Sequence, residues 1–187
     1  ATARMRAIVG RIAGRLRDLH AVAVVVPAFA PAASVEHYAT ALARGTALSQ
    51  HASRWHQEYV GLAWWYLERF EPSVLCHNDL VADNVLDDGA GLWLVDFEYA
   101  CRAHPILDLA SVAALNGYRP RDRAALCAAY YHDRRPPFSA REFERVVRMQ
   151  ELLAYFWAAW SCTEEIENSR RRAYSGSWAT LLQKRER

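Results

Sequence analysis

Polar side chains able to do chemistry gather in one short stretch near the middle of the 187-residue sequence. His77, Asp79 and Asn84 follow the pattern H-x-D-x-x-x-x-N, and Asp96 and Glu98 come soon after. Phosphoryl transfer needs a carboxylate that orients and accepts the proton of a hydroxyl. It also needs a second carboxylate and a side-chain carbonyl that hold Mg²⁺ against nucleotide phosphates. The stretch therefore indicates phosphoryl transfer, and the alternative is a capped loop with solvated acids.

Short β-like segments are expected to bring these side chains together. The run 74–76 precedes the loop, and the apolar runs 85–86 and 92–95 flank an Asp- and Gly-rich turn. This pattern is typical of a β-hairpin. A loop between strands can hold Asp79 close to Asn84, and the hairpin can then return the chain to the same place.

The rest of the chain is predicted to be helical. Ile8, Ile12, Leu16 and Leu19 recur at three- and four-residue spacing, which predicts an amphipathic helix over residues 2–20. Similar reasoning predicts further helices at 35–43 (capped by Ser34), 49–70, 106–117, 121–132 and 139–168. The expected fold is mainly α with a small central β-hairpin region, in one domain covering residues 1–187.

Two motifs in the central stretch resemble those of a known family. The sequence "LCHNDLVADNVL" at 75–86 and "LVDFEYA" at 94–100 are similar to the Brenner-type and Asp-Phe-Glu-Tyr motifs of choline/ethanolamine kinases. These enzymes are relatives of the aminoglycoside phosphotransferases within the protein-kinase-like fold. Asn78 and Glu98-Tyr99 favour the choline kinase branch, since aminoglycoside enzymes more often read His-Gly-Asp. The resemblance implies the C-terminal lobe of that fold, an α+β structure.

The resemblance also implies roles for the polar residues. Asp79 would be the catalytic base, Asn84 and Asp96 would be metal ligands, and Glu98 would assist at a second metal. The implied function is ATP-dependent phosphorylation of the hydroxyl of choline, ethanolamine or a similar small amino alcohol, with Mg²⁺ as cofactor and ATP as co-substrate.

Two further residues are expected to support the site. His77 is expected to brace the loop by hydrogen bonding, and direct chemistry is the alternative. The segment 104–110 resembles the family's next motif, in which an aspartate (here Asp108) buttresses the catalytic loop. The segment 16–20, Leu-Arg-Asp-Leu-His, resembles the one that opens the family's C-terminal lobe.

An aromatic run, 155–160, falls on the last predicted helix. Trp157 and Trp160 are three residues apart and share one face of that helix. Aromatic faces bind quaternary ammonium groups, and the run is similar to the Phe-Trp-x-x-Trp stretch of the choline pocket, which Tyr99 would join. Periodicity alone indicates core packing, so both readings stay open. The acid that eukaryotic choline kinases carry near this chain's Asn116 is missing, which leaves ethanolamine or another amino alcohol possible.

One part of a working kinase is missing from the sequence. This fold holds nucleotide phosphates with an N-terminal lobe that carries a phosphate-covering loop and a strand lysine. Here the only lysine is Lys184, in a basic tail. The N-terminal lobe is therefore expected to be absent from this chain. The chain alone is expected to be inactive and to self-associate through the exposed lobe interface. The alternatives are an aminoglycoside-type or other small-molecule phosphotransferase, and a non-catalytic half-kinase binding module.

Composition limits the remaining possibilities. The net charge of +2 is too small to suggest a nucleic-acid partner. Four scattered cysteines without a CxxC pair fit core thiols in a reducing compartment. No apolar run approaches the roughly 20 residues of a membrane span. The sequence predicts a cytoplasmic protein with no nucleic-acid or membrane partner.

Overall fold

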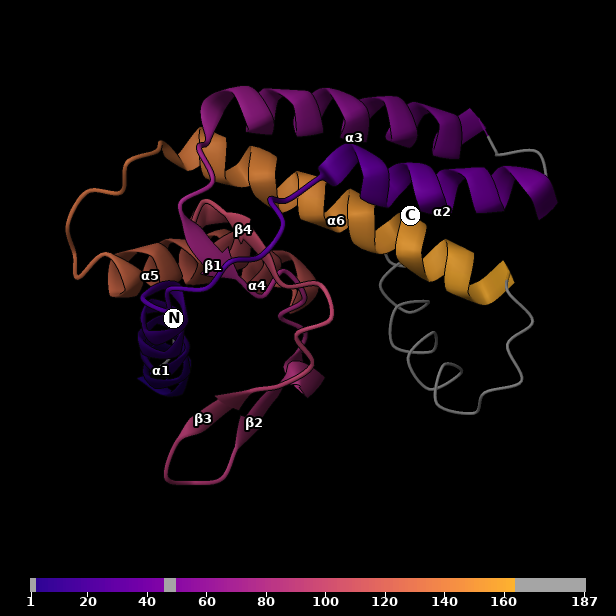
Figure 1. The fold of residues 1–187 in the computed structure, drawn as a ribbon. Helices are drawn as coiled ribbons and strands as arrows, with labels where there is room; N and C mark the ends of the chain where they lie inside the picture. Colours follow the sequence, from indigo (N-terminus) through magenta and orange to yellow (C-terminus); the bar gives the residue numbers. More distant parts are fainter. Residues whose placement is uncertain (1–2, 46–49, 164–187) are drawn as a thin grey trace. The chain divides into compact units, whose positions relative to one another are not determined.

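The computed structural model describes residues 3–45 and 50–163 (Figure 1). The chain divides into two compact units. The first is built from Ala1–Phe29 and Tyr66–Gln150, and the second from Ala30–Trp65 and Glu151–Arg187. All of the central polar motif lies in the first unit, so that unit positions the candidate site.

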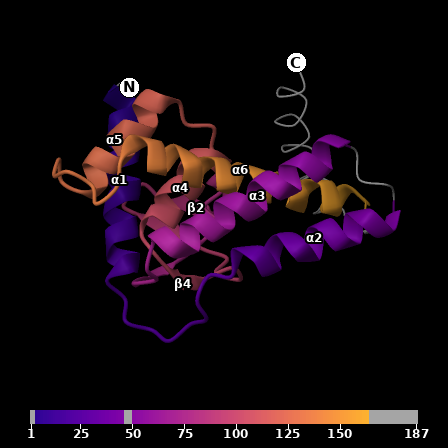
Figure 2. The same ribbon diagram turned by 90° about the horizontal axis from the view of Figure 1, so that it is seen from above.

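Helix α1 (Ala3–His20) lies alongside α5 (Pro120–Tyr130) in the first unit (Figure 2). The predicted helix is present, but its buried stripe differs from the predicted one. Val9 and Ala13 are buried together with Leu16 and Leu19, whereas Ile8 is exposed. Arg17 donates hydrogen bonds to the last carbonyl groups of α5, at 2.8 and 3.3 Å. These carbonyl groups lie at the C-terminal end of the helix, where a cation complements the helix dipole.

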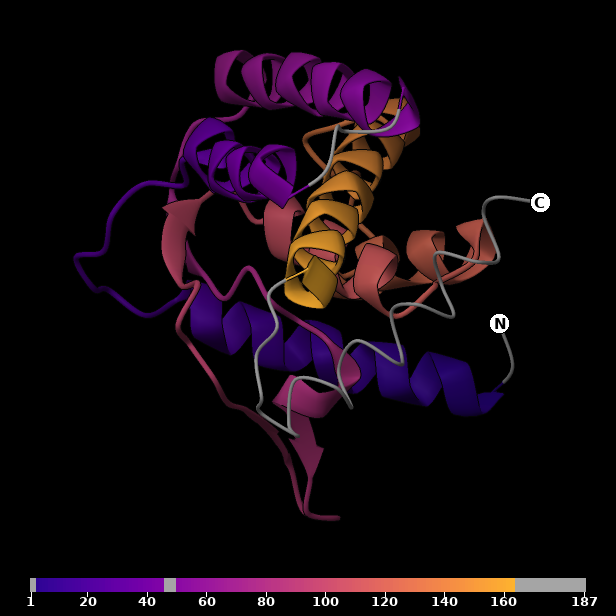
Figure 3. The same ribbon diagram turned by 90° about the vertical axis from the view of Figure 1, so that its right-hand side faces the viewer.

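Two small antiparallel sheets lie in the first unit. Strand β1 (Val74–Cys76) pairs with β4 (Cys101–Ala103), and β2 (Val85–Asp87) pairs with β3 (Leu92–Leu94). The β2–β3 pair is the hairpin that the sequence predicts, and it extends away from the β1–β4 pair (Figures 1 and 3). Strand β4 is not predicted by the sequence, because a three-residue Cys-Arg-Ala segment carries no alternation long enough to detect.

Helix α4 (Ile106–Leu115) forms the core of the first unit, and its residues from Ile106 to Ala113 are all buried. Its first turn is capped from outside the helix: the Nδ1 of His104 accepts the N–H of Ile106 at 3.1 Å. Burial, followed by the charges of Arg69 and His20, lowers the pKa of His104 to about 4. The cap therefore requires the neutral imidazole.

This cap predicts a loss of stability in mild acid. The pKa of His104 lies near 4 in the folded chain and near its ordinary 6.5 in the unfolded chain. The contribution to stability is complete above pH 6.5 and is lost as the pH falls toward 4. Because the ring is partly exposed, we expect a loss of roughly 1 kcal/mol. Melting temperatures of wild type and His104→Asn should converge over this window. His132→Asn, at an exposed turn, is the control, and parallel curves would contradict the prediction.

Helix α6 (Ala140–Thr163) begins with a capping box. The Oγ of Ser139 accepts the N–H of Glu142 at 3.2 Å, and the carboxylate of Glu142 accepts the N–H of Ser139 at 2.7 Å. The helix begins one residue later than the helix over 139–168 that the sequence predicts. Its first part, to Gln150, belongs to the first unit, and its second part belongs to the second unit.

The described part of the second unit contains α2 (Pro31–Gly45), most of α3 (Gln50–Arg69) and the second part of α6. Tyr59 of α3 donates a hydrogen bond to the carbonyl of Pro31 at 3.0 Å, and α2 and α3 lie side by side (Figure 3). The prediction of Ser34 as a helix cap is wrong. Helix α2 begins earlier, at Pro31, and the Ser34 hydroxyl donates back to the carbonyl of Ala30. None of the helices among the described residues is long and apolar enough to span a membrane.

Candidate active site

The loop that follows β1 carries the predicted site residues and is braced by a buried histidine. His77 Nε2 donates to the carbonyl of Val95 at 2.9 Å, so its Nδ1 must be the atom that accepts the N–H of Asp79, at 3.3 Å. These two contacts define the neutral tautomer with the proton on Nε2. They also join the loop to the residue that precedes Asp96. Both ring nitrogens of His77 are thus committed to holding backbone.

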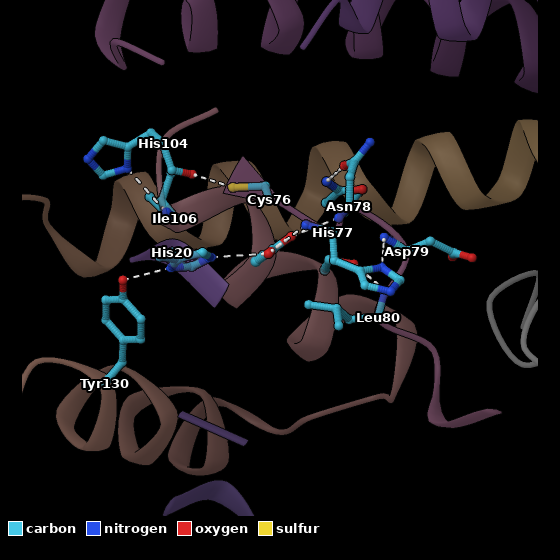
Figure 4. Close-up of polar contacts among 12 residues, drawn as sticks. His20, Cys76, His77, Asn78, Asp79, Leu80, His104, Ile106 and Tyr130 are labelled. Carbon is cyan, nitrogen blue, oxygen red and sulfur yellow. Dashed lines mark hydrogen bonds and ion pairs between the residues drawn. The ribbon is translucent and has the colours of Figure 1, made fainter. Parts of the chain in front are cut away.

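Asp108 of α4 lies beneath this loop and is fully buried. Its two carboxylate oxygens accept the backbone N–H groups of His77, at 2.9 Å, and Asn78, at 2.8 Å. His20, from the end of α1, contacts the same carboxylate at 3.1 Å and contacts the hydroxyl of Tyr130 at 2.7 Å (Figure 4). A buried carboxylate needs such partners. The arrangement joins α1, α4 and α5 to the backbone of the loop.

Two further side chains anchor the loop, and the sequence motifs do not indicate this role for them. Ser111 accepts the N–H of Leu80 at 3.1 Å, and Asn116 donates to the carbonyl of Leu80 at 2.8 Å. Both belong to the helix of Asp108 or its end. Ser111 is three residues after Asp108, about one helical turn, and that spacing is its sequence signal, whereas Asn116 directly follows the last residue of α4.

Asn84 lies at the end of the short 3-10 helix Ala82–Asn84 and is buried. Its Nδ2 donates to the backbone carbonyl of Asp79 and to its carboxylate Oδ2, both at 2.9 Å. Since both partners can only accept, the orientation of the amide is fixed. The Oδ1 of Asn84 is left as the atom available to a cation. The structure thus brings the Asp79 and Asn84 side chains together.

A family model named "Phosphotransferase enzyme family" (APH) matches residues 2–143, which is more than half of the chain and includes this whole loop. The chain belongs to the phosphotransferase enzyme family. No curated protein matches it significantly.

Solved structures with the same fold include phosphotransferases of two kinds. Choline kinase LicA from Streptococcus pneumoniae has a TM-score of 0.72 at 17% identity over 96% of this chain and 64% of its own. A choline/ethanolamine kinase family protein from Mesorhizobium loti has a TM-score of 0.70 at 22% identity, over 91% of this chain and 59% of its own. Macrolide 2′-phosphotransferase type I has a TM-score of 0.56 at 16% identity, over 91% and 57%. The chain spans less than two thirds of the length of each of these proteins. The TM-scores confirm the predicted kinase-like fold class.

Within this phosphotransferase loop, the Asp79 carboxyl has an unusual electrostatic environment. Burial raises its pKa, the nearby carboxylates of Asp96 and Glu98 also raise it, and His77 and Asn84 lower it. Together these effects bring the pKa to about 6. A pKa near the working pH suits a group that takes up a proton during reaction. Figure 4 shows the Asp79 side chain pointing away from the network around His20 and Tyr130.

The predicted metal ligands on the segment after β3 are open to solvent. Asp96 adopts a left-handed backbone conformation, with φ of 65°, and Asp96, Glu98 and Tyr99 are all exposed. The ligand atoms of Asp79, Asp96 and Glu98 do not all come within 4.8 Å of one another among the described residues. Their effect on the pKa of Asp79 nevertheless indicates that the two acids lie near it.

Within residues 3–45 and 50–163, one group of three buried residues has ligand atoms within 4.8 Å of one another, namely His20, Cys76 and Asp108. Its members are already paired by hydrogen bonds. The Cys76 thiol donates to the carbonyl of His104 at 3.6 Å, and burial raises its pKa well above its usual value. The Cys76 thiol is therefore protonated and hydrogen-bonded, and it supports the structure of this buried network.

The predicted aromatic residues lie on the second part of α6, in the second unit. Trp157 is half-buried, and the side chain of Trp160 lies outside the described residues, as does Lys184. In the same unit Tyr155 packs edge-to-face on Trp55, with ring centroids 4.6 Å apart. The aromatic run is thus partly engaged in packing.

Proposed function

We propose that this chain carries the catalytic centre of an ATP-dependent phosphotransferase that phosphorylates the hydroxyl of choline, ethanolamine or a similar small amino alcohol. The observation that carries the proposal is the Asp79–Asn84 pair, in which one amide holds both the backbone and the carboxylate of Asp79. Membership of the phosphotransferase family and the fold of two choline kinase-type proteins support it.

In this proposal Asp79 orients the acceptor hydroxyl and accepts its proton. Asn84 engages the Oδ2 of Asp79, which leaves Oδ1 for the incoming hydroxyl. Partial burial keeps the carboxyl basic, since it raises its pKa to about 6. A hydroxyl hydrogen-bonded to Oδ1 would have its oxygen directed at the transferring phosphoryl group, and the positioning itself contributes to the rate.

Asn84 Oδ1, Asp96 and Glu98 are the residues that would hold Mg²⁺. The donors are all oxygen atoms, which this hard cation prefers, and the exposed acids are free to approach nucleotide phosphates. When bound, Mg²⁺ neutralises the charge of the phosphates. Choline kinase LicA has been crystallised in complex with AMP, which supports nucleotide as the phosphoryl donor here.

We also propose that nucleotide binding uses an N-terminal lobe outside these 187 residues. Kinase-like folds grip phosphates with a loop and lysine of that lobe, and the single lysine here is Lys184. The chain covers 64% and 59% of the two choline kinase-type structures, which supports this proposal. The 187-residue chain on its own is then inactive and prone to associate through the face that the lobe would cover.

The acceptor is proposed to be a small cation, read by aromatic rings including Tyr99, Trp157 and Trp160. The test uses the intact protein that contains this chain, with ATP, Mg²⁺ and a panel of choline, ethanolamine, an aminoglycoside and a macrolide. We expect phosphocholine or phosphoethanolamine by mass spectrometry. Trp157→Ala should raise the KM of the amino alcohol roughly 2- to 30-fold, because one cation–π contact contributes about 0.5–2 kcal/mol. The KM of ATP should not change.

The matched control is Trp64→Ala, since Trp64 is 60% exposed on α3. It should leave both KM values unchanged. Phosphorylation of the antibiotics alone would favour the antibiotic-modifying alternative. No transfer to any acceptor would favour a binding module. A lower melting temperature of Trp157→Ala with an unchanged choline-to-ethanolamine ratio would assign Trp157 to the core.

A further inference from the structure

The backbone conformation of Asn78 sets the direction of the next residue, Asp79. Asn78 has a φ of 63°, in the left-handed region of backbone conformation that residues other than glycine rarely adopt. Asparagine tolerates this region better than most residues, at some cost relative to glycine. The conformation persists only because contacts around the residue hold it.

Two tethers hold Asn78 from two different helices. Its backbone N–H donates to Asp108 of α4 at 2.8 Å, and its side-chain Oδ1 accepts from the Nε2 of Gln150 of α6 at 3.1 Å. Figure 4 draws the side chain of Asn78 above the loop and its backbone N–H at the loop itself. The two contacts restrain both the backbone and the side chain of one residue.

Gln150 is 2% exposed, so it is a polar side chain placed in the core of the first unit. Burying an amide is unfavourable unless it is hydrogen-bonded. The Gln150 amide donates to Asn78, and an apolar residue of the same size would fill the space at this helix position. The hydrogen bond to Asn78 of the loop therefore explains why a polar side chain occupies this buried position.

We propose that Gln150 is a positioning residue for Asp79, acting through Asn78. It holds the side chain of Asn78 so that the left-handed conformation is kept and the Asp79 carboxylate stays in register with Asn84. The role rests on the proposed phosphotransferase function, and it concerns the rate of the chemical step instead of substrate binding.

The test compares Gln150→Met, which keeps the volume and removes the donor, with wild type in the intact protein. We expect kcat to fall about 10-fold, because a small misplacement of a reacting group costs one to two orders of magnitude. The KM values of ATP and of the acceptor should stay within about 2-fold, since uniform binding is untouched. Gln57→Met, the same change at an exposed position of α3, should alter none of these values.

A double-mutant cycle then tests whether the two residues act as a pair. Asn78→Gly suits the left-handed backbone and keeps the tether to Asp108, but removes the side-chain acceptor. If Gln150 acts through Asn78, the double variant Asn78→Gly/Gln150→Met should be no slower than the slower single variant. Independent roles would multiply the two losses instead. That multiplicative result would overturn the proposal.

Hydrogen exchange of the loop supplies a readout that does not need turnover. In Gln150→Met the amides of residues 77–79 should exchange faster at a temperature where the protein is fully folded. If wild type fails to transfer phosphate, the proposed function fails, but faster loop exchange still supports the positioning role. Unchanged kcat together with unchanged loop exchange would overturn it, and a lower melting temperature with neither change would make Gln150 a packing residue only.

Discussion

Replacing Asp79 with asparagine is expected to lower kcat by roughly 10²- to 10⁴-fold while the fold stays intact. Asparagine has the same shape and can still accept the hydrogen bond from Asn84, but it cannot take up a proton. Burial makes the charged carboxylate costly, as the raised pKa of Asp79 indicates. The neutral variant should therefore be at least as stable as wild type near pH 7. Turnover and melting temperature of the intact protein are the two measurements.

The control for this substitution is Asp83→Asn, at an exposed position four residues along the same loop. It removes an equal charge near the site and should leave kcat within about 2-fold, as surface substitutions generally do. Turnover of Asp79→Asn close to the wild-type value would remove Asp79 from the role of base. A parallel loss in both variants would instead point to the overall charge of the loop.

Replacing Asp108 with alanine is expected to destabilise the protein by about 3 kcal/mol or more. Two backbone N–H groups and the His20 ring lose their acceptor inside the core, and each buried unpaired donor costs about 1–3 kcal/mol. For a chain of this size the melting temperature should fall by roughly 6–12 °C. Thermal unfolding followed by circular dichroism measures this directly.

Asp108→Asn separates the structural effect from a general loss of volume. It keeps the size and one acceptor oxygen, so a smaller loss of stability is expected, with the donor –NH₂ facing another donor. Asp83→Ala serves as the exposed control and should change the free energy of unfolding by less than about 0.5 kcal/mol. An unchanged melting temperature for Asp108→Ala would mean that the loop amides find other acceptors.

The sequence predicted the parts of the molecule that depend on local patterns. The H-x-D-x-x-x-x-N spacing located the loop, and the turn residues located the β2–β3 hairpin. The helix over residues 2–20 was also found, although its buried stripe includes Val9 instead of Ile8. Hydrophobic periodicity alone does not show which of two neighbouring apolar stripes is buried, because this depends on where the partner helix packs.

The parts that were not predicted depend on contacts between distant segments. His20 and Asp108 are 88 residues apart, and Asn78 and Gln150 are 72 apart. No period or motif indicates such pairs. The division into two units is equally invisible in the sequence, since α3 and α6 each run from one unit into the other without a break. The assignments of the metal ligands and of the aromatic acceptor site stay predictions.

The buried carboxylate of Asp108 has a consequence for the order in which the protein folds. Its partners come from the end of the first helix and from a loop more than fifty residues later, so the loop obtains its geometry only when these segments have docked on α4. Helices form quickly from local contacts, whereas contacts between distant segments form late. A refolding chain therefore regains its helical content before the geometry of this loop, and in a nascent chain the loop stays unformed until α4 has been synthesised and packed.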